Sequence, residues 1–118
     1  MAERYLVYYN PQCSNARGTV EILRDKGLEV DIHEYLEDPL DRAALERILD
    51  AIPNPPADLV RKDKRFEELS LAADDYKTHE AVIELLLEHP ELMQRPVVFR
   101  GDRALITRPP EQVLRLLD

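Results

Sequence analysis

The chain has few of the residues that define several other classes of protein. Its 118 residues include one cysteine, three glycines and three histidines. A single cysteine excludes a disulfide within the chain, and it suits a reducing compartment such as the cytoplasm. Three glycines leave no glycine-rich phosphate loop, and the histidines share no spacing typical of metal ligands. We therefore expect no bound metal and no bound cofactor.

Positive charge and long apolar runs are also scarce. The chain has 16 basic and 24 acidic residues, which gives a formal net charge of −8 at pH 7. Nucleic-acid binding relies on basic patches, so we expect no nucleic-acid partner. No apolar run is long enough to span a bilayer and no secretory segment precedes the first strand, so we expect no membrane partner. With 44% hydrophobic and 34% charged residues, residues 1–118 should form one globular domain, monomeric and cytoplasmic.

Residues 8–17, Tyr-Tyr-Asn-Pro-Gln-Cys-Ser-Asn-Ala-Arg, organise the rest of the chain. They join an apolar strand at residues 5–8 to a helix that Cys13 opens and Gly27 ends. The unpaired amides of a helix's first turn attract anions and lower the pKa of a nearby thiol. We therefore predict that Cys13 is an exposed, reactive thiol beside an oxyanion site, although a lone cysteine is often only a small core residue. Because residue 16 is alanine, an adduct on Cys13 must be resolved by a thiol from another molecule, such as glutathione or a redox protein.

The remaining pattern predicts further strands and helices. A strand at residues 30–35 follows one helix after the first strand, which makes the two parallel. Gly101-Asp102 should form a type II′ turn between strands 97–100 and 104–107. A helix is expected after Asp41, with Leu45, Ile48, Leu49 and Ile52 facing inward, and a short helix over residues 57–63. Another helix is expected after Thr78, with Ala81, Val82, Leu85 and Leu86 facing inward. A last helix is expected over residues 111–117, with Val113, Leu114 and Leu117 apolar. Phe66, Leu69 and Leu71 are expected to be small core anchors. This order predicts an α/β fold with a mixed four-stranded sheet (βαβ, helical insertion, ββα) flanked by helices.

Four short motifs resemble those of one known family. They lie at residues 9–14 (Tyr-Asn-Pro-Gln-Cys-Ser), 60–62 (Val-Arg-Lys), 94–96 (Gln-Arg-Pro) and 107–111 (Thr-Arg-Pro-Pro-Glu). In this order, over nearly the whole chain, they are similar to the glutaredoxin-coupled arsenate reductase family (ArsC-like), in a shorter branch that ends soon after the last helix. The resemblance implies a thioredoxin fold. It also implies an oxidoreductase that reduces arsenate to arsenite, with glutathione as co-substrate and glutaredoxin as partner.

The resemblance assigns roles to individual residues. Cys13 would be the nucleophile, and Arg61, Arg95 and Arg108 would hold the oxyanion, helped by the first-turn residues Ser14 and Asn15. Asn10, Pro11, Arg17 and Pro96 would shape the site, and Pro96 would follow a cis peptide bond. Tyr9 stands where arsenate-reducing members often have histidine.

Two other functions fit the same sequence features. One is a thioredoxin-like transcriptional regulator that binds RNA polymerase and uses Cys13 as a redox sensor. The other is a glutathione-dependent thiol reductase without specificity for arsenate. A regulator needs no oxyanion clamp, so three arginines that converge on Cys13 would favour an enzyme.

Overall fold

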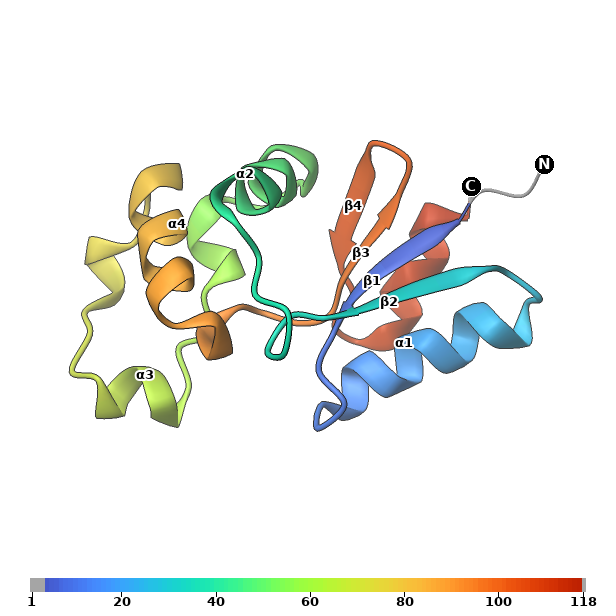
Figure 1. The fold of residues 1–118 in the computed structure, drawn as a ribbon, viewed down its shortest axis with the longest axis horizontal. Coiled ribbons are helices and arrows are strands. Elements are labelled where there is room, and N and C mark those ends of the chain that lie inside the picture. The colour runs from blue at the N-terminus through green and yellow to red at the C-terminus, as the bar shows by residue number, and fades with distance from the viewer. Residues whose placement is uncertain (1–3, 118) are drawn as a thin grey trace. The chain divides into compact units, whose positions relative to one another are not determined.

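The computed structural model describes residues 4–117, which divide into two compact units. A sheet unit combines residues up to Asp38 with residues from Arg95 onward, and a helical unit spans Pro39–Gln94 (Figure 1). Within the described part, no helix is both long and apolar enough to cross a membrane. The two ends of the chain therefore build one unit, and the segment between them builds the other.

The sheet unit contains four strands in the order β2-β1-β3-β4. β1 (Tyr5–Tyr9) lies parallel to β2 (Val30–Glu34), and it is antiparallel to β3 (Val97–Arg100) on its other side. β3 in turn pairs antiparallel with β4 (Arg103–Ile106). The predicted mixed four-stranded sheet and the predicted parallel first pair are therefore confirmed.

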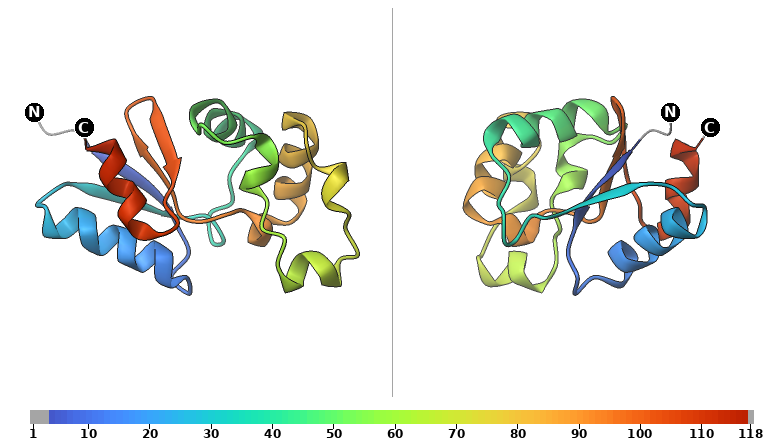
Figure 2. Two further views of the ribbon diagram at one scale, coloured as in Figure 1. Left: turned by 180° about the vertical axis from the view of Figure 1, so that it is seen from behind. Right: turned by 45° about the vertical axis from the view of Figure 1, so that its right-hand side comes forward.

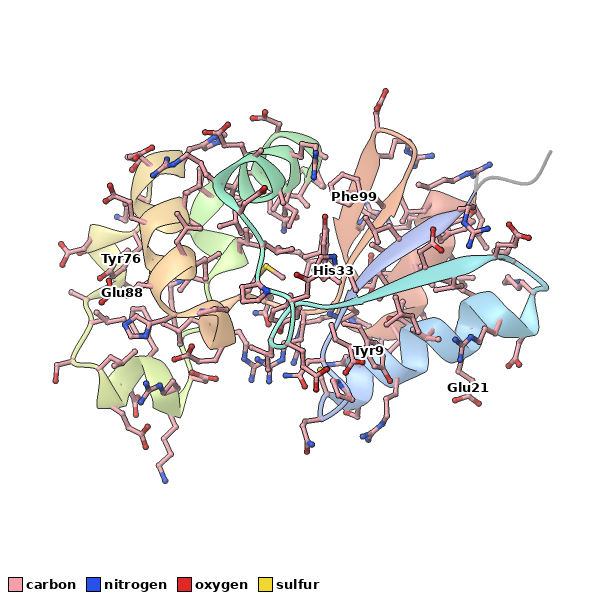
Figure 3. The ribbon with its side chains drawn as sticks, viewed as in Figure 1. Tyr9, Glu21, His33, Tyr76, Glu88 and Phe99 are labelled. Carbon is pink, nitrogen blue, oxygen red and sulfur yellow. The ribbon has the colours of Figure 1, made fainter. Side chains whose placement is uncertain are left out.

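Two helices cover one face of this sheet: α1 (Ser14–Asp25) and the 3₁₀ helix η4 (Pro110–Leu116) (Figure 2). The core beneath them draws one or two residues from each neighbouring element: Tyr5, Val7, Val20, Leu23, Val98, Leu105, Val113 and Leu116. On the opposite face, the Tyr8 ring lies 5.2 Å from the ring of His33 and 6.1 Å from that of Phe99, both labelled in Figure 3. Because α1 begins directly after the β1 turn, its packing on the core fixes where that turn lies.

The end of α1 follows the expected pattern. Gly27 has a φ of +75°, a conformation that favours glycine. Its N–H donates to Arg24 O, and the N–H of Leu28 donates to Leu23 O, which together form a Schellman motif. Gly101 has a φ of +60° at the first turn position of the β3–β4 hairpin, as a type II′ turn requires. Both glycine predictions are confirmed.

The last helix departs from the predicted packing. The sequence suggested Val113, Leu114 and Leu117 as the apolar face, but the structure buries Val113 and Leu116 while Leu114 is 40% exposed. The reason is the helix type, because a 3₁₀ helix has three residues per turn and places residues i and i+3 on one side. Leu117 packs, partly buried, against the edge of the same core.

The helical unit contains two longer helices whose caps were predicted. α2 (Arg42–Ala51) begins after Asp41, whose Oδ1 accepts from the Ala44 N–H at 2.9 Å. α4 (His79–Glu88) begins after Thr78, whose hydroxyl accepts from the Ala81 N–H at 3.1 Å. The predicted inward residues of both helices are buried, except that Ala81 is half-buried.

The segment between these helices differs from the prediction. In place of a helix over residues 57–63, there is a single 3₁₀ turn, η1 (Pro56–Leu59), after which Val60 is extended and bridges to Met93. Asp63 instead caps a missed short helix, α3 (Lys64–Glu68), by accepting from the Phe66 N–H at 3.2 Å. Phe66 is buried as predicted. Short 3₁₀ turns η2 (Ala73–Asp75) and η3 (Pro90–Leu92) complete the unit, and Leu69 and Leu71 are half-buried.

Candidate active site

The turn after β1 is held in one shape by its own polar groups. Asn10 is only 5% exposed, and its Oδ1 accepts from the Gln12 N–H at 2.9 Å. Its backbone oxygen accepts from the Cys13 N–H at 3.0 Å. Arg17, one turn into α1, reaches back so that its Nη1 donates to Pro11 O at 3.0 Å. These contacts hold the turn between Asn10 and Cys13 in shape, and the role of Asn10, Pro11 and Arg17 at an active site stays a prediction.

Cys13 is the residue from which α1 starts. Its backbone is extended (φ −96°, ψ 119°), as is usual for the residue that precedes the first turn of a helix. The residue is 8% exposed, which corrects the expectation of an exposed thiol. Ala16, Val20 and Leu23, which follow at helical spacing, are buried as well.

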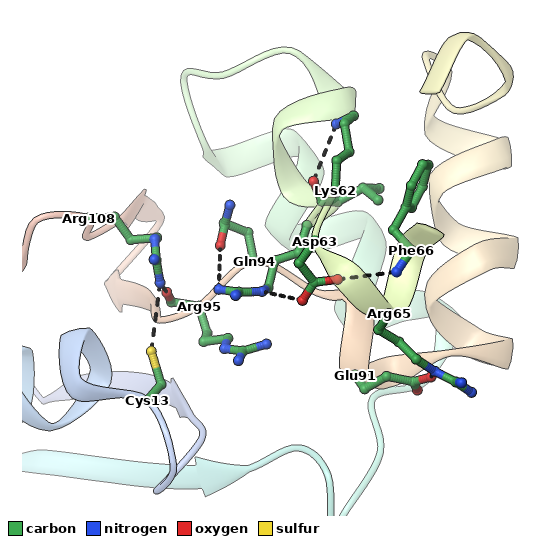
Figure 4. A network of polar contacts seen from close by, with 11 residues as sticks. Cys13, Lys62, Asp63, Arg65, Phe66, Glu91, Gln94, Arg95 and Arg108 are labelled. Atoms are coloured by element: carbon green, nitrogen blue, oxygen red, sulfur yellow. Dashed lines mark hydrogen bonds and ion pairs between the residues drawn. The ribbon is translucent and has the colours of Figure 1, made fainter. Parts of the chain in front are cut away.

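Arg108 brings a cation to this sulfur. Its Nη1 lies 3.7 Å from Cys13 Sγ. A dashed line marks this contact in Figure 4. The same Nη1 donates to the backbone oxygen of Arg95 at 2.9 Å. With the Asn15 amide oxygen turned toward the guanidinium, both Nη1 and Nη2 donate to it at 3.1 Å. The structure therefore brings Cys13, Asn15, Arg95 and Arg108 together.

The surroundings of Cys13 favour the thiolate. Burial raises the pKa of the thiol, but the backbone N–H of Ala16, the Arg95 guanidinium and the backbone N–H of Asn15 all lower it, and the net direction is downward. Arg95 acts in two ways, through a hydrogen bond and through its charge. The predicted depressed pKa of Cys13 is therefore supported, with the first-turn amides and an arginine as its causes.

The peptide bond between Arg95 and Pro96 is cis, as the resemblance implied. A second cis bond, between Arg108 and Pro109, was not anticipated. Each therefore follows one of the two arginines of this site. Ser14 is exposed at the first position of α1.

Arg61 belongs to the helical unit, and its role at the oxyanion site stays a prediction. Its Nε donates to Asp63 Oδ2 at 3.2 Å, and its Nη1 donates to Gln94 Oε1 at 3.4 Å. Figure 4 labels both acceptor residues. Its backbone N–H donates to Leu92 O at 2.7 Å. The neighbouring Lys62 places Nζ on Ala57 O at 2.7 Å, so this lysine is engaged with its own loop. Four contacts within the helical unit thus hold the segment that carries Arg61.

One pair of residues near the site was missed by the sequence reasoning. The hydroxyl oxygens of Thr19 and Thr107 lie 2.8 Å apart, and both residues are fully buried. The sequence held a signal that could have pointed to each of these two residues. Thr19 is a polar residue on the inward face of α1, three residues after Ala16, and Thr107 directly precedes Arg108.

Metal binding has no support in the described part of the chain. Between residues 4 and 117, no group of three or more histidine, cysteine or carboxylate side chains is placed to hold an ion.

Comparison with known proteins assigns the family. The ArsC family model matches residues 8–116. The chain is 39% identical to the uncharacterized protein YfgD of Escherichia coli strain K12, over 99% of each chain. It is 37% identical to the arsenate reductase of the same organism, over 94% of this chain and 79% of that protein.

A solved arsenate reductase from Vibrio cholerae superposes with a TM-score of 0.87 at 32% identity, and the match covers 98% of each chain. The predicted thioredoxin-like fold is therefore confirmed. With the family model matching nearly the whole chain, this protein belongs to the ArsC family.

Proposed function

We propose that this protein is an arsenate reductase that uses glutathione and glutaredoxin and works through a covalent Cys13 adduct. The observation that carries the proposal is the Arg108 guanidinium 3.7 Å from the sulfur of a thiol whose pKa is lowered. Such a group is a nucleophile with a cation beside it, which is what attack on an oxyanion needs. Similarity to the arsenate reductases of E. coli and V. cholerae supports arsenate as that oxyanion.

The first step is attack of the Cys13 thiolate on arsenic. A sulfur–arsenic bond forms, and one arsenate oxygen leaves as water after taking up protons. The guanidinium groups of Arg95 and Arg108 offset the charge of the oxyanion, and the amides of Asn15 and Ala16 face the same space. Planar guanidinium groups suit this role because they can donate two parallel hydrogen bonds to one oxyanion.

The second step transfers two electrons to arsenic. A glutathione thiolate attacks the Cys13 sulfur, so that a disulfide forms while the sulfur–arsenic bond breaks. The electron pair of that bond stays on arsenic, which leaves as arsenite. A glutaredoxin thiol then attacks the glutathione sulfur and releases the Cys13 thiolate. An external thiol is required because Cys13 is the only cysteine of the chain.

The proposal extends to the setting of the enzyme. Turnover by free glutathione requires a reducing compartment, so we place the protein in the cytoplasm. We propose that it acts as a monomer with no bound cofactor, glutathione being a co-substrate that is consumed.

A coupled assay tests the proposal directly. Purified protein is supplied with arsenate, glutathione and glutaredoxin, and arsenite is measured with time. We expect wild-type protein to form arsenite and Cys13→Ser to form none, because a serine hydroxyl is not a nucleophile here without a base. Arg24→Gln, which changes an exposed cation at the far end of α1, serves as the matched control and should keep full turnover. A Cys13→Ser variant with near wild-type turnover would refute the covalent mechanism.

Arginine-to-lysine variants separate an oxyanion clamp from surface ion pairs. Arg61→Lys, Arg95→Lys and Arg108→Lys keep the charge but lose the planar fork. A lost charge-assisted hydrogen bond is worth about 1.5–3 kcal/mol, so kcat/KM for arsenate should fall roughly tenfold to a hundredfold. An exposed ion pair is worth about 0–1 kcal/mol and acts on stability alone. Unchanged kinetics in all three variants would favour the redox-sensing regulator, and arsenate-independent turnover of glutathione disulfides would favour the thiol reductase.

A further inference from the structure

The Thr19 and Thr107 hydroxyls form a buried polar contact between two segments that are distant in the sequence. Both residues are 0% exposed, and their oxygens lie 2.8 Å apart although the residues are 88 positions apart in sequence. Thr19 lies on α1, the helix that Cys13 starts, and Thr107 directly precedes Arg108. The contact therefore joins the element that carries the thiol to the segment that carries its cation.

Thr107 is also the point where a third segment meets these two. Its backbone N–H donates to Pro96 O at 3.1 Å, and Pro96 directly follows Arg95. The Arg108 side chain then donates to Arg95 O at 2.9 Å. Thr107 thus contacts α1 through its hydroxyl and the segment after Arg95 through its backbone N–H, and it is covalently bonded to Arg108.

The neighbouring glycine shows how closely the two segments approach. A Cβ placed on Gly18 would lie 3.0 Å from Cγ of Pro110, so a side chain there would push the segments apart. Gly18 precedes Thr19, and Pro110 begins η4. The two segments are therefore in close contact at Gly18 as well as at Thr19.

We propose that the Thr19–Thr107 pair is a positioning device that sets the distance between Cys13 and the arginines at residues 95 and 108. Its kinetic consequence rests on the proposed function, but its effect on the thiol does not. A hydrogen bond holds two oxygens at 2.8 Å, whereas two methyl groups in contact lie about 3.5–4.0 Å apart. Replacing both hydroxyls with methyls should therefore move α1 away from residue 107 by up to about 1 Å.

Such a displacement has two expected effects. The guanidinium groups would lie farther from the sulfur, so the thiol pKa should rise by about half a unit or more, a fraction of the ~1–3 units that a nearby opposite charge produces. Arsenate turnover should fall about tenfold to a hundredfold, since a misplacement of about 1 Å can cost that much. A purely structural pair would leave both quantities unchanged.

The experiment compares Thr19→Val, Thr107→Val and the double variant with wild type. Each single variant leaves one buried hydroxyl without a partner and should lower Tm, whereas the double variant removes both and should recover most of the lost Tm. We expect the double variant to combine this recovered Tm with a raised thiol pKa, measured from the pH dependence of its reaction with a small disulfide. A double variant with wild-type thiol pKa and wild-type turnover, whatever its Tm, would overturn the proposal.

Two further variants keep the test decisive. Thr19→Ser keeps the hydroxyl, so its thiol pKa should stay at the wild-type value even if Tm falls, and a raised pKa there would overturn the proposal should the double variant fail to fold. Thr78→Val removes the cap of α4 in the helical unit, so it lowers Tm without moving the thiol pKa. If wild type reduces no arsenate while the double variant still raises the thiol pKa, the proposed function fails and the positioning role stands.

Discussion

Replacing Arg95 with glutamine should raise the pKa of the Cys13 thiol. The wild-type pKa reflects opposing influences, because burial raises it while two first-turn amides and Arg95 lower it. Glutamine removes the positive charge and leaves both the burial and the amides in place. Two of the lowering influences come from Arg95, its hydrogen bond and its charge, so the direction of the change is fixed.

The size of the change follows from the strength of such interactions. An opposite charge close to an ionisable group lowers its pKa by about 1–3 units, and we take about one unit because the Ala16 and Asn15 amides remain. At a pH below both pKa values, a rise of one unit leaves about one tenth of the thiolate. The more basic thiolate is intrinsically about threefold more nucleophilic toward a disulfide, so the observed rate should fall only about three- to fourfold.

The pH profile supplies a second signature. Above both pKa values every thiol is ionised, so only the intrinsic nucleophilicity differs, and Arg95→Gln should then react about threefold faster than wild type. The two curves should therefore cross. Reaction with dipyridyl disulfide gives the rates, and thiolate absorbance in the ultraviolet, with Cys13→Ser as the blank, gives the pKa independently.

Arg24→Gln is the matched control for this measurement. Arg24 is an exposed cation in the last turn of α1, whereas Cys13 lies at the start of that helix. Its removal changes the net charge by the same amount as Arg95→Gln does, so a general effect of charge would appear in both variants. Equal thiol pKa values in Arg95→Gln and wild type, or curves that do not cross, would refute the role of Arg95.

Two further predictions concern stability. Because the pKa of Cys13 is lower in the folded than in the unfolded state, the stability of wild type relative to Cys13→Ser should increase as pH rises from the folded-state pKa to the unfolded value of about 8.5. Above that pH the difference in stability should stay constant. Urea unfolding at several pH values measures it, and a stability difference that grows toward low pH would contradict the prediction. Gly27→Ala should destabilise the protein by about 1 kcal/mol because residue 27 has a φ of +75°, whereas Lys26→Ala, at a φ of −87°, should not. Equal urea midpoints for the two variants would show that the end of α1 tolerates a side chain at residue 27.

Much of the fold was predictable because its signals are local. The caps at Asp41 and Thr78, the stop at Gly27 and the turn at Gly101 each depend on one residue type at one backbone position. The parallel pairing of β1 and β2 follows from a single helix between them. Such features need no knowledge of distant residues.

Other features depend on contacts that a sequence pattern does not reveal. Val60 leaves its 3₁₀ turn because Met93, 33 residues later, offers it a backbone partner. The joint burial of Val113 and Leu116 follows from the 3₁₀ form of η4, which the apolar pattern did not reveal because it allowed several choices of buried face. The Thr19–Thr107 contact could not be predicted from the sequence for the same reason, because the two residues lie 88 positions apart.

The site itself was only partly readable from sequence. The position of Cys13 at a helix start could be predicted, and so could two of its arginines by resemblance. The burial of Cys13 could not be predicted, because it depends on how α1 packs on the sheet. This burial matters for chemistry, since it works against the thiolate.

The magnitudes explain why the helix start alone is not enough. Half ionisation at neutral pH requires a downward shift of about 1.5 pKa units, or about 2 kcal/mol, from the reference thiol value. A helix terminus supplies about 0.3–1 kcal/mol, and the burial of Cys13 increases the requirement. Arginine at the sulfur has to supply the difference. The groups that would hold an oxyanion are therefore the same groups that make the nucleophile, and an arginine lost from this site should weaken substrate binding and thiol ionisation together.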